Sequence, residues 1–378
     1  LHSTVRDHLG RKMSKSLGNG IAPLQVVELI GADALRYTVI AAAGVGTDVH
    51  LNPDDLEEAF SPGRNFANKL WNIGRFALLN LEGREVRRPA ELGDALELSD
   101  RWILSRLGAA VEECEAALTA FRFHEYAATV YHFLWGDLAD WYVELIKPRL
   151  QEDEDASEAS RLAARSTLVA VLDGGLRLLH PIMPFVTEAL WQRLPLPERE
   201  AESLVIAAWP EAAAGARDDE AEAAMGALIE LIGTVRGLRS EYDVTPSQKI
   251  AVRLGNVGPA LRAALAGEAQ ALARLARVED VLLDGAAAGG EPGAHAVLRG
   301  GAELFVPLAG IIDLERERER LGKELDRLEG QLRATEGRLG NQAFVGKAPA
   351  EVVEREREKA ASFRDQVERL SRKRAALG

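Results

Sequence analysis

Apolar positions along most of the chain recur every three or four residues, the spacing that puts side chains on one face of an α-helix. Near the N-terminus this spacing predicts a helix that opens at Pro23 and a second over 32–43. A short apolar alternation before them predicts a strand over 1–5. Between about 47 and 210 the spacing predicts a helical bundle with members at 62–79, from 99 onward, around 126–146, at 157–180 and at 186–194.

Residues that begin and end helices refine these bounds. We expect Ser61 and Ser99 to be N-caps, because a short hydroxyl side chain can accept a bond from the first turn. We expect Pro62 at the first helical position, where its missing N–H costs nothing. We expect Pro148 to end the third helix of the bundle, because proline breaks the backbone hydrogen-bond ladder.

The segment from about 211 to 312 mixes both periods and predicts a small α/β module. Helical spacing from Met225 to Leu238 predicts one helix, and an alanine-rich run predicts another over 259–276. Alternation predicts strands over 249–254 and 278–283. A Gly/Ala-rich loop over 284–293 follows, and then a hairpin of strands 296–298 and 303–307 around Gly300-Gly301.

The last segment, 313–378, carries apolar residues at the alternating three and four spacing of a coiled coil. The pattern runs over 314–339, is interrupted by Gly340, Gly346 and Pro349, and resumes over 352–377. Two arms of equal length, each about 39 Å as a helix, flank this interruption. The pattern therefore predicts one antiparallel coiled-coil hairpin rather than a long parallel dimer.

Composition sets bounds on the class of protein. The chain has 378 residues and a formal charge of −13, which argues against a general polyanion-binding protein. Its one cysteine, Cys114, excludes an internal disulfide and a cysteine zinc site, and favours a reducing, cytoplasmic compartment. No apolar run is long enough to predict a membrane span. The chain begins with Leu1 rather than Met, so we expect it to be a piece of a longer protein.

Charge is unevenly distributed along the chain. The hairpin segment holds 16 Lys and Arg against 14 Asp and Glu, whereas the rest holds 30 against 45. One interpretation is a solvated coiled-coil surface stabilised by ion pairs between neighbouring helical turns. The other is an arm that follows a phosphate backbone. Composition alone does not decide between them.

The run Lys12-Met13-Ser14-Lys15-Ser16 is the chemically specific signal in the sequence. Two lysines bracket a hydroxyl, and Gly18-Asn19-Gly20 follows, so the loop can bend and bring amides and mobile cations to an anion. These features suit a reaction in which charge builds up on a leaving pyrophosphate. On residue types alone, a basic surface loop is the alternative.

The run resembles the KMSKS signature of class I aminoacyl-tRNA synthetases. The resemblance implies that Lys12, Met13, Ser14, Lys15 and Ser16 bind ATP, and that Lys12 and Lys15 are catalytic, stabilising the transition state of amino-acid activation. It also implies Mg²⁺ with the ATP, and no protein-bound metal. The flanking Gly31-Ala32-Asp33-Ala34-Leu35-Arg36 is similar to the class Ia subgroup that handles Val, Ile and Leu.

Further resemblances narrow the subgroup to the valyl enzymes. The runs 64–72 and 140–144 resemble helices of their anticodon-binding bundle, and 344–357 resembles their C-terminal arm. The implied fold is mainly α. Its implied parts are a KMSKS-loop remnant of a class I catalytic domain over 1–46, an anticodon-binding helical bundle over 47–210, the α/β module over 211–312 and a coiled-coil tRNA-binding arm over 313–378.

The resemblance implies a ligase that attaches valine to tRNA(Val) through valyl-adenylate, acting as a monomer. The family's second ATP-binding signature, His-x-Gly-His, is absent from the seven histidines of this chain. The valine pocket and the editing domain would also precede Leu1. We therefore expect this chain alone to be inactive.

Residues for tRNA contact are predicted at two places. On the helix 62–79, Arg64, Asn68, Lys69, Asn72 and Arg75 could read anticodon bases, with Trp71 beside them. In that region Trp71 and Phe66 could instead be core residues, and the polar groups could tie the bundle to the catalytic domain. In the arm, the residues expected to contact tRNA are Lys347, Arg364, Arg369, Arg372, Lys373 and Arg374.

Two single residues have a structural interpretation. His180 is expected to be a satisfied core histidine and Cys114 a small buried hydrophobic residue. For the chain as a whole, the alternative to an enzyme portion is a stand-alone tRNA-binding or coiled-coil interaction module with a vestigial loop.

Overall fold

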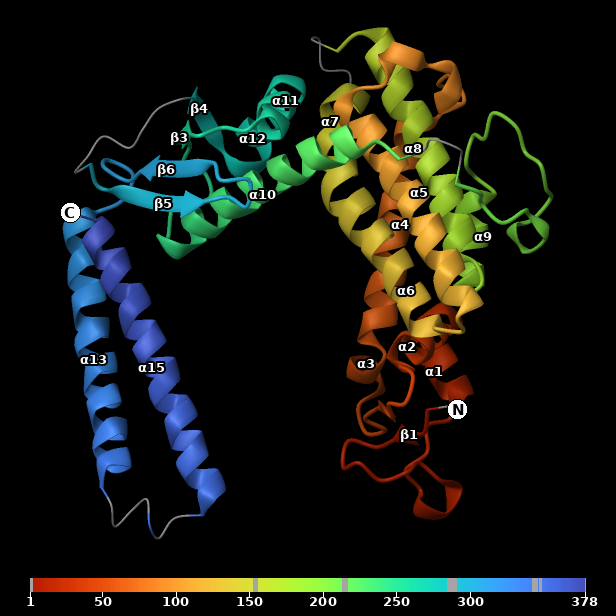
Figure 1. Cartoon of the computed structure of the whole chain (residues 1–378). Helices are drawn as coiled ribbons and strands as arrows, with labels where there is room; N and C mark the ends of the chain where they lie inside the picture. Colours follow the sequence, from red (N-terminus) through yellow and green to blue (C-terminus); the bar gives the residue numbers. More distant parts are fainter. Residues whose placement is uncertain are drawn as a thin grey trace. The chain divides into compact units, whose positions relative to one another are not determined.

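The computed structural model describes residues 3–151, 156–212, 217–283, 291–341, 346 and 349–377 (Figure 1). These residues form two compact units, Leu1–Met225 and Gly226–Gly378, and the division falls within helix α10 (Asp219–Glu241). Each unit has its own hydrophobic core. The Gly/Ala-rich loop predicted over 284–293 lies, up to residue 290, outside the described residues.

The first unit begins with two strands and a helix pair. Strand β1 (Val5–Arg6) pairs in parallel with β2 (Val49–His50), and the connection between them contains α1 (Pro23–Ile30) and α2 (Ala32–Ala42). A parallel pair needs such a crossover, because a tight turn can join only antiparallel strands. We expected a strand over 1–5, but β1 begins only at Val5. Residues 1–2 lie outside the described residues.

The bundle follows as a set of packed helices. Its elements are α3 (Leu56–Ala59), α4 (Ser61–Leu81), α5 (Leu98–Thr119), α6 (Phe123–Tyr131), the π-helical segment η4 (His132–Tyr142), α7 (Val143–Leu150), α8 (Glu158–Leu179) and α9 (Pro184–Trp191). Short 3₁₀ turns lie at Lys15–Leu17, Pro89–Glu91, Gly93–Ala95 and Leu204–Ile206. The core is formed by large side chains that are almost fully buried, among them Phe66, Leu70, Ile103, Tyr142, Leu172 and Trp191.

A buried polar network ties four of these elements together, namely α5, η4, α7 and α8. The carboxylate of Asp100, which has no exposed surface, accepts bonds from the Arg149 guanidinium at 2.7 and 3.1 Å and from the Tyr142 hydroxyl at 2.7 Å. Arg149 also donates to the backbone carbonyl of Ser160 at 2.7 Å. Because every partner is satisfied, the bundle can keep this charge pair in its core.

Three predicted helix boundaries in the bundle are wrong. Helix α4 starts at Ser61 with Phe60 as its N-cap, so Ser61 is the first helical residue and Pro62 the second. Helix α5 is capped by Glu97, whose side chain and backbone bond reciprocally with Asp100, and Ser99 lies inside the helix. Helix α7 runs through Pro148 and ends at Leu150, whereas we expected the proline to end it.

The second unit contains a four-stranded sheet in the order β4-β3-β6-β5. Its strands are β3 (Ile250–Gly255), β4 (Val278–Leu283), β5 (Gly293–Val297) and β6 (Glu303–Pro307). Strands β3 and β4 are parallel, and their connection contains α11 (Pro259–Gly267) and α12 (Ala269–Ala276), so the single helix predicted over 259–276 is divided at Glu268. Strands β5 and β6 form the predicted antiparallel hairpin, but β5 spans Gly293–Val297, whereas we expected a strand over 296–298.

The arm is the predicted antiparallel hairpin. Helices α13 (Leu314–Gly340) and α15 (Ala350–Ala376) lie side by side, as Figure 1 shows. Cross-helix ion pairs follow an antiparallel register, with Arg338 to Glu356 at 3.4 Å and Arg364 to Glu336 at 2.6 Å. The buried seam is thin and consists of Leu321, Leu325, Leu328, Thr335, Val353, Ala360, Lys373 and Leu377.

Candidate functional site

The candidate nucleotide-binding loop is built on one buried carboxylate. Asp7 has no exposed surface, and its oxygens accept bonds from the Leu9 and Arg11 backbone amides at 3.0 and 2.8 Å. They also accept the Asn19 side-chain amide at 2.9 Å and the Arg11 guanidinium at 2.8 Å. The Asn19 bond above all, with Arg11, holds the pKa of Asp7 well below its usual range. The loop therefore has an ionised anchor.

Asn19 closes the loop from its other end. Its side-chain oxygen accepts the Ser14 backbone amide at 2.9 Å, and its side-chain NH₂ donates to the Lys12 carbonyl at 3.4 Å as well as to Asp7. The preceding Gly18 has a φ of 65°, in the left-handed region that glycine adopts without steric cost. Residues 12–19 thus form a closed turn fixed by side-chain bonds.

This turn leaves both signature lysines in solvent. Lys12 and Lys15 are exposed, and within the described part of the chain neither ammonium group has an ion-pair or hydrogen-bond partner. Met13, between them, packs against a small core that includes Val26 and Phe60. Met13 therefore anchors the loop, while Lys12 and Lys15 present two unneutralised cations to solvent.

The two predicted hydroxyls are partly used within the loop. Ser14 Oγ accepts the Leu17 amide at 3.3 Å as the N-cap of the 3₁₀ turn, and lies 3.1 Å from Ser16 Oγ. Ser16 is exposed and has no further bond among the described residues. Ser16 is therefore the freer of the two hydroxyls for an incoming anion.

The helix pair after the loop is clamped to the bundle. On α2, the Asp33 carboxylate accepts the backbone amides of Phe185 and Val186, at 3.2 and 2.7 Å, in the first turn of α9. One turn later, the Arg36 guanidinium donates to the carbonyls of Pro181 and Ile182, both at 2.8 Å. Helix α2 thus bonds both backbone N–H and backbone C=O groups of the segment 181–186.

An aromatic cluster continues from α2 into the bundle. Tyr37 and Phe66 have ring centroids 5.0 Å apart, Phe66 and Tyr131 are also 5.0 Å apart, and Tyr131 stacks on Trp135 at 5.3 Å. Trp135, which belongs to the π-helical segment, is half-buried and forms the surface end of the cluster. The cluster therefore links the loop-bearing helix pair to a surface of the bundle.

That surface carries the predicted residue Lys69. Its ammonium lies 2.7 Å from the Asp140 carboxylate and 5.2 Å from the centre of the Trp135 ring. A second lysine on the same side, Lys147, pairs with Glu144 and lies 5.8 Å from the ring centre of Phe76. We call Lys69, Phe76, Trp135, Asp140 and Lys147 the α4–η4 surface. It combines cations with half-exposed aromatic rings, the combination that binds unpaired bases.

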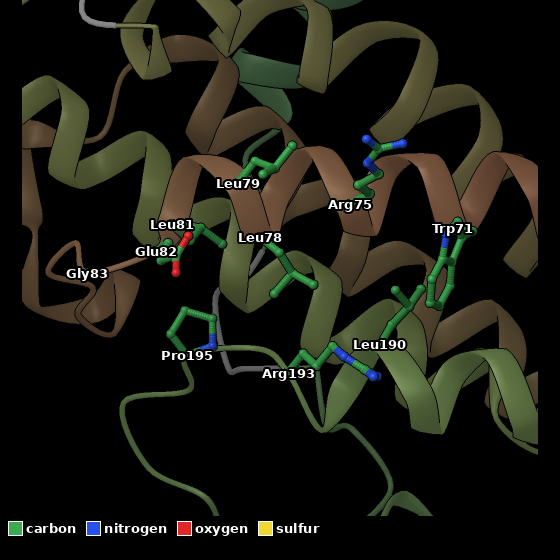
Figure 2. Close-up of a pocket in the computed structure, with 10 residues that line it drawn as sticks. All are labelled: Trp71, Arg75, Leu78, Leu79, Leu81, Glu82, Gly83, Leu190, Arg193 and Pro195. Atoms are coloured by element: carbon green, nitrogen blue, oxygen red, sulfur yellow. The ribbon is translucent and has the colours of Figure 1, made fainter.

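Trp71 and the predicted residue Arg75 lie on a different side of α4 from Lys69. Trp71 and Arg75 are exposed and line a cavity of about 510 Å³ between α4 and α9, whose apolar wall includes Leu78 and Leu190 (Figure 2). Trp71 is therefore not a core residue, whereas Phe66 is. The remaining predicted residues of α4, which are exposed or half-exposed, are Arg64, Asn68 and Asn72. The Arg64 guanidinium lies 3.9 Å from the Glu57 carboxylate.

The predicted tRNA-contacting residues of the arm differ in their exposure and in their ion-pair partners. Arg369, Arg372 and Arg374 are exposed, and Arg372 pairs with Glu368. Arg364 pairs with Glu336 across the hairpin. Lys373 differs from our expectation of a surface phosphate contact, because its side chain is only 6% exposed. Lys347 lies outside the described residues.

Cys114 is buried as expected, whereas His180 has a partner as expected but is only half-buried rather than a core residue. Cys114 is fully buried, and burial raises the pKa of its thiol to about 12. His180 Nδ1 lies 2.8 Å from the Thr187 hydroxyl, so this histidine has a partner within the fold. No cluster of side chains suited to a metal ion occurs in the described ranges. Nor does any helix there combine the length and apolarity of a membrane span.

Asp7, Asn19 and the Asp33–Arg36 pair have roles that the sequence did not predict. The one sequence signal for these roles is position: Asp7 and Asn19 flank the KMSKS run, and Asp33 and Arg36 lie within the run 31–36 that is similar to the class Ia subgroup. Nothing in the spacing says that Asn19 would reach back twelve residues to Asp7, or that Asp33 would bond amides 152 residues away.

Three family models match successive parts of the chain. Residues 1–52 match the model for class I tRNA synthetases of the Ile, Leu, Met and Val group. Residues 100–254 match the anticodon-binding domain of tRNA ligases, and residues 313–378 match the valyl-tRNA synthetase tRNA-binding arm.

Curated relatives match along the whole chain. The valine–tRNA ligase of Geobacillus stearothermophilus is 39% identical over 377 residues, which is 100% of this chain and 42% of that protein. The enzyme of Carboxydothermus hydrogenoformans is 40% identical over 363 residues, covering 96% of this chain and 40% of that protein. The chain thus spans about two fifths of the length of these relatives.

Solved structures resemble the chain more weakly. Methionyl-tRNA synthetase of Mycobacterium tuberculosis, bound by methionyl-adenylate, is 24% identical, with a TM-score of 0.42, over 57% of this chain and 43% of that one. A likeness at this level says nothing about the site. Identity along the entire chain and the three family models show instead that the chain belongs to the valine–tRNA ligase family of class I aminoacyl-tRNA synthetases.

Proposed function

We propose that this chain is the part of a valine–tRNA ligase that supplies the pyrophosphate-side loop of the active site and the tRNA-binding surfaces. The complete enzyme would form valyl-adenylate from valine and ATP and then transfer the valyl group to tRNA(Val). The observation that carries the proposal is the pair of exposed, unpaired lysines, Lys12 and Lys15, on a turn anchored by buried Asp7 and Asn19.

The chemistry of this loop follows from its charges. In activation, a valine carboxylate oxygen attacks the α-phosphorus of ATP, and the bond from that phosphorus to the bridging oxygen breaks, releasing pyrophosphate. Negative charge grows on the leaving group, so two cations carried by this loop stabilise the transition state more than the ground state. We assign this role to Lys12 and Lys15, with Ser16 donating a hydrogen bond to a phosphate oxygen. In the second step, a ribose hydroxyl of the tRNA attacks the valyl carbonyl and AMP leaves.

The loop offers little to a magnesium ion. Its only carboxylate, Asp7, is buried and fully occupied by Arg11, Asn19 and two backbone amides. Mg²⁺ prefers several free oxygen ligands. We therefore propose that any Mg²⁺ arrives on the ATP phosphates and is held outside this loop.

We further propose that tRNA contacts the α4–η4 surface and the arm. Stacking on half-exposed rings such as Trp135 and Phe76 suits splayed anticodon bases, and Lys69 and Lys147 lie beside those rings. In the arm, exposed Arg369, Arg372 and Arg374 suit a phosphate backbone. The functional parts that we assign are the loop segment 1–46, the bundle 47–210, the module 211–312 and the arm 313–378. We propose a monomer acting in the cytoplasm.

The tRNA part of the proposal can be tested on the chain itself. We would measure binding of tRNA(Val) and of a non-cognate tRNA by fluorescence anisotropy across a salt series. We expect preference for tRNA(Val) and a loss of about tenfold in affinity for Trp135→Leu, the typical contribution of one stacked base. Trp71→Leu, on the other side of α4, is the matched control and should bind normally. Equal losses for both variants, or a loss for Trp71→Leu alone, would contradict the α4–η4 surface.

The catalytic part needs the complete active site. The chain would be joined to the part of a valine–tRNA ligase that it does not span, and ATP–pyrophosphate exchange measured. Lys15→Ala should lower kcat by at least tenfold with little change in the KM for valine, since a cation that acts in the transition state affects kcat. Lys249→Ala, which removes an exposed lysine outside the loop, is the charge control.

A stand-alone tRNA-binding module is the competing function. It predicts tRNA binding by the chain but no effect of Lys12 or Lys15 on exchange in the joined enzyme. Exchange activity in the chain alone would contradict our expectation that the chain is inactive without the rest of the enzyme.

A further inference from the structure

Lys373 lies at the root of the arm, by which we mean the start of α13 and the end of α15 where they meet the end of α10. Its burial there is unusual for an RNA-binding lysine. Its side chain is 6% exposed, and its ammonium lies 3.4 Å from the carboxylate of Glu317 on α13. It also donates to the backbone carbonyl of Glu241, the last residue of α10, and lies 4.4 Å from the ring centre of Tyr242. Lysine is almost never buried unless it is paired, and here three partners satisfy it.

These partners come from both sides of the root. Glu317 belongs to the other helix of the arm, whereas Glu241 is the last residue of α10 and Tyr242 follows it, in the same compact unit as the arm. Glu317 is itself held by Arg320, whose guanidinium lies 2.7 Å from its carboxylate. A single ammonium therefore joins α13, α15 and the end of α10.

The neighbouring arginines have the opposite environment. Arg369 and Arg372 are exposed and border a hollow of about 400 Å³ beside the root, and Arg374 on the next residue is exposed as well. The run 369–374 thus contains three exposed arginines and one buried lysine, whose side chain also borders the hollow but whose ammonium lies against Glu317, Glu241 and Tyr242. The Lys373 ammonium already interacts with the Glu317 carboxylate, the Glu241 carbonyl and the Tyr242 ring, so a phosphate would have to displace all three.

We propose that Lys373 is a positioning residue, which fixes the angle of the arm against the α/β module, and that it does not contact RNA phosphates. The proposal rests on tRNA being the partner of the arm, as proposed above. A fixed angle presents the arm to the tRNA in one orientation, without the loss of effective concentration that a freely moving joint would cause.

The first experiment measures the angle without tRNA. Spin labels on Glu351→Cys, at the distal end of α15, and Arg299→Cys, on the β5–β6 turn, report their distance by pulsed electron spin resonance. The native Cys114 is buried and is not expected to take up label. We expect a narrow distance distribution in the parent chain, a broad one in Lys373→Met and in Glu317→Gln, and partial recovery in Lys373→Arg. An unchanged distribution in both loss variants would overturn the proposal.

The second experiment separates positioning from phosphate contact. Each lost phosphate contact lowers the slope of log affinity against log salt concentration by about 1. We expect Lys373→Met to weaken tRNA binding several-fold with an unchanged slope. Arg374→Gln, the adjacent exposed cation, is the matched control and should lower the slope by about 1. A lowered slope in Lys373→Met would overturn the proposal.

Failure of the proposed function is distinguishable from failure of this inference. If the parent chain does not bind tRNA, the tRNA part of the proposed function fails, and the label distances still decide whether Lys373 holds the arm. If the parent binds tRNA but the distances do not change, the function stands and the positioning role is refuted.

Discussion

Replacing Asp33 by alanine should release the start of α9 while leaving the bundle folded. The N–H groups of Phe185 and Val186 belong to the first turn of α9, where no intrahelical carbonyl can accept them. The Asp33 carboxylate is the acceptor for both, at 3.2 and 2.7 Å. A residue of α2 thus performs the capping role that a neighbouring residue normally performs.

The size of the effect follows from this geometry. A hydrogen bond to a charged group contributes about 1.5–3 kcal/mol, and loss of an N-cap costs about 0.5–2 kcal/mol. Burial raises the pKa of Asp33 against the opposing effect of the two amides, so desolvation offsets part of the gain. We therefore expect a local cost of about 1–2 kcal/mol, which corresponds to a factor of about 5–30 in the opening equilibrium.

Amide hydrogen exchange measured by NMR at Phe185 and Val186 tests this expectation directly. Both amides should exchange about 5–30 times faster in Asp33→Ala, whereas those in the centre of α8 should be unchanged. Asp33→Asn retains an acceptor oxygen and should recover part of the protection. Asp55→Ala, which removes the local cap of α3, is the control and should leave α9 unaffected. Unchanged exchange at the two amides would refute the cross-element cap, and equal acceleration throughout α8 would refute a local effect.

Three further predictions concern buried ionisable groups. The low pKa of Asp7 means that its contribution to loop stability is present above its unfolded pKa of about 3.8 and is lost as pH falls further; the Leu9 amide shift should therefore titrate by NMR with a midpoint below 3.8. Arg149→Met should destabilise the first unit by about 3–5 kcal/mol in urea unfolding because it strands the Asp100 charge, and adding Asp100→Asn should recover part of the loss; an additive double mutant would contradict the charge pair. Since burial raises the pKa of Cys114 to about 12, its thiol should react with a disulfide reagent at pH 8 only at the rate of unfolding, and fast reaction of the folded chain would show that it is accessible.

The features that could be predicted from sequence are those set by local spacing. The heptad pattern predicts arm helices at 314–339 and 352–377, and they lie at Leu314–Gly340 and Ala350–Ala376. The helix predicted from residue 157 begins at Glu158, with Ser157 as its N-cap. The KMSKS run indicates the family without any knowledge of tertiary contacts, because five residues in one order carry that signature.

Other boundaries depended on contacts that spacing does not contain. A serine near the start of a helix caps it only where no other side chain makes the capping bonds. In α5 Glu97 and Asp100 make those bonds, and Ser99 lies inside the helix. Pro148 was expected to end its helix. It loses one backbone bond, but the buried Arg149 beside it is held by Asp100, so the last turn persists.

The sequence by itself determined the family, the loop and the hairpin arm, because helical period, turn residues and a signature run are local properties of the chain. The tertiary structure alone decided which charges are available. Lys12 and Lys373 are the same residue type in basic surroundings, yet one projects into solvent and the other is enclosed by Glu317, Tyr242 and a carbonyl. The difference comes from groups 56 to 132 residues away in sequence that pack around the ammonium, and no spacing rule reports them.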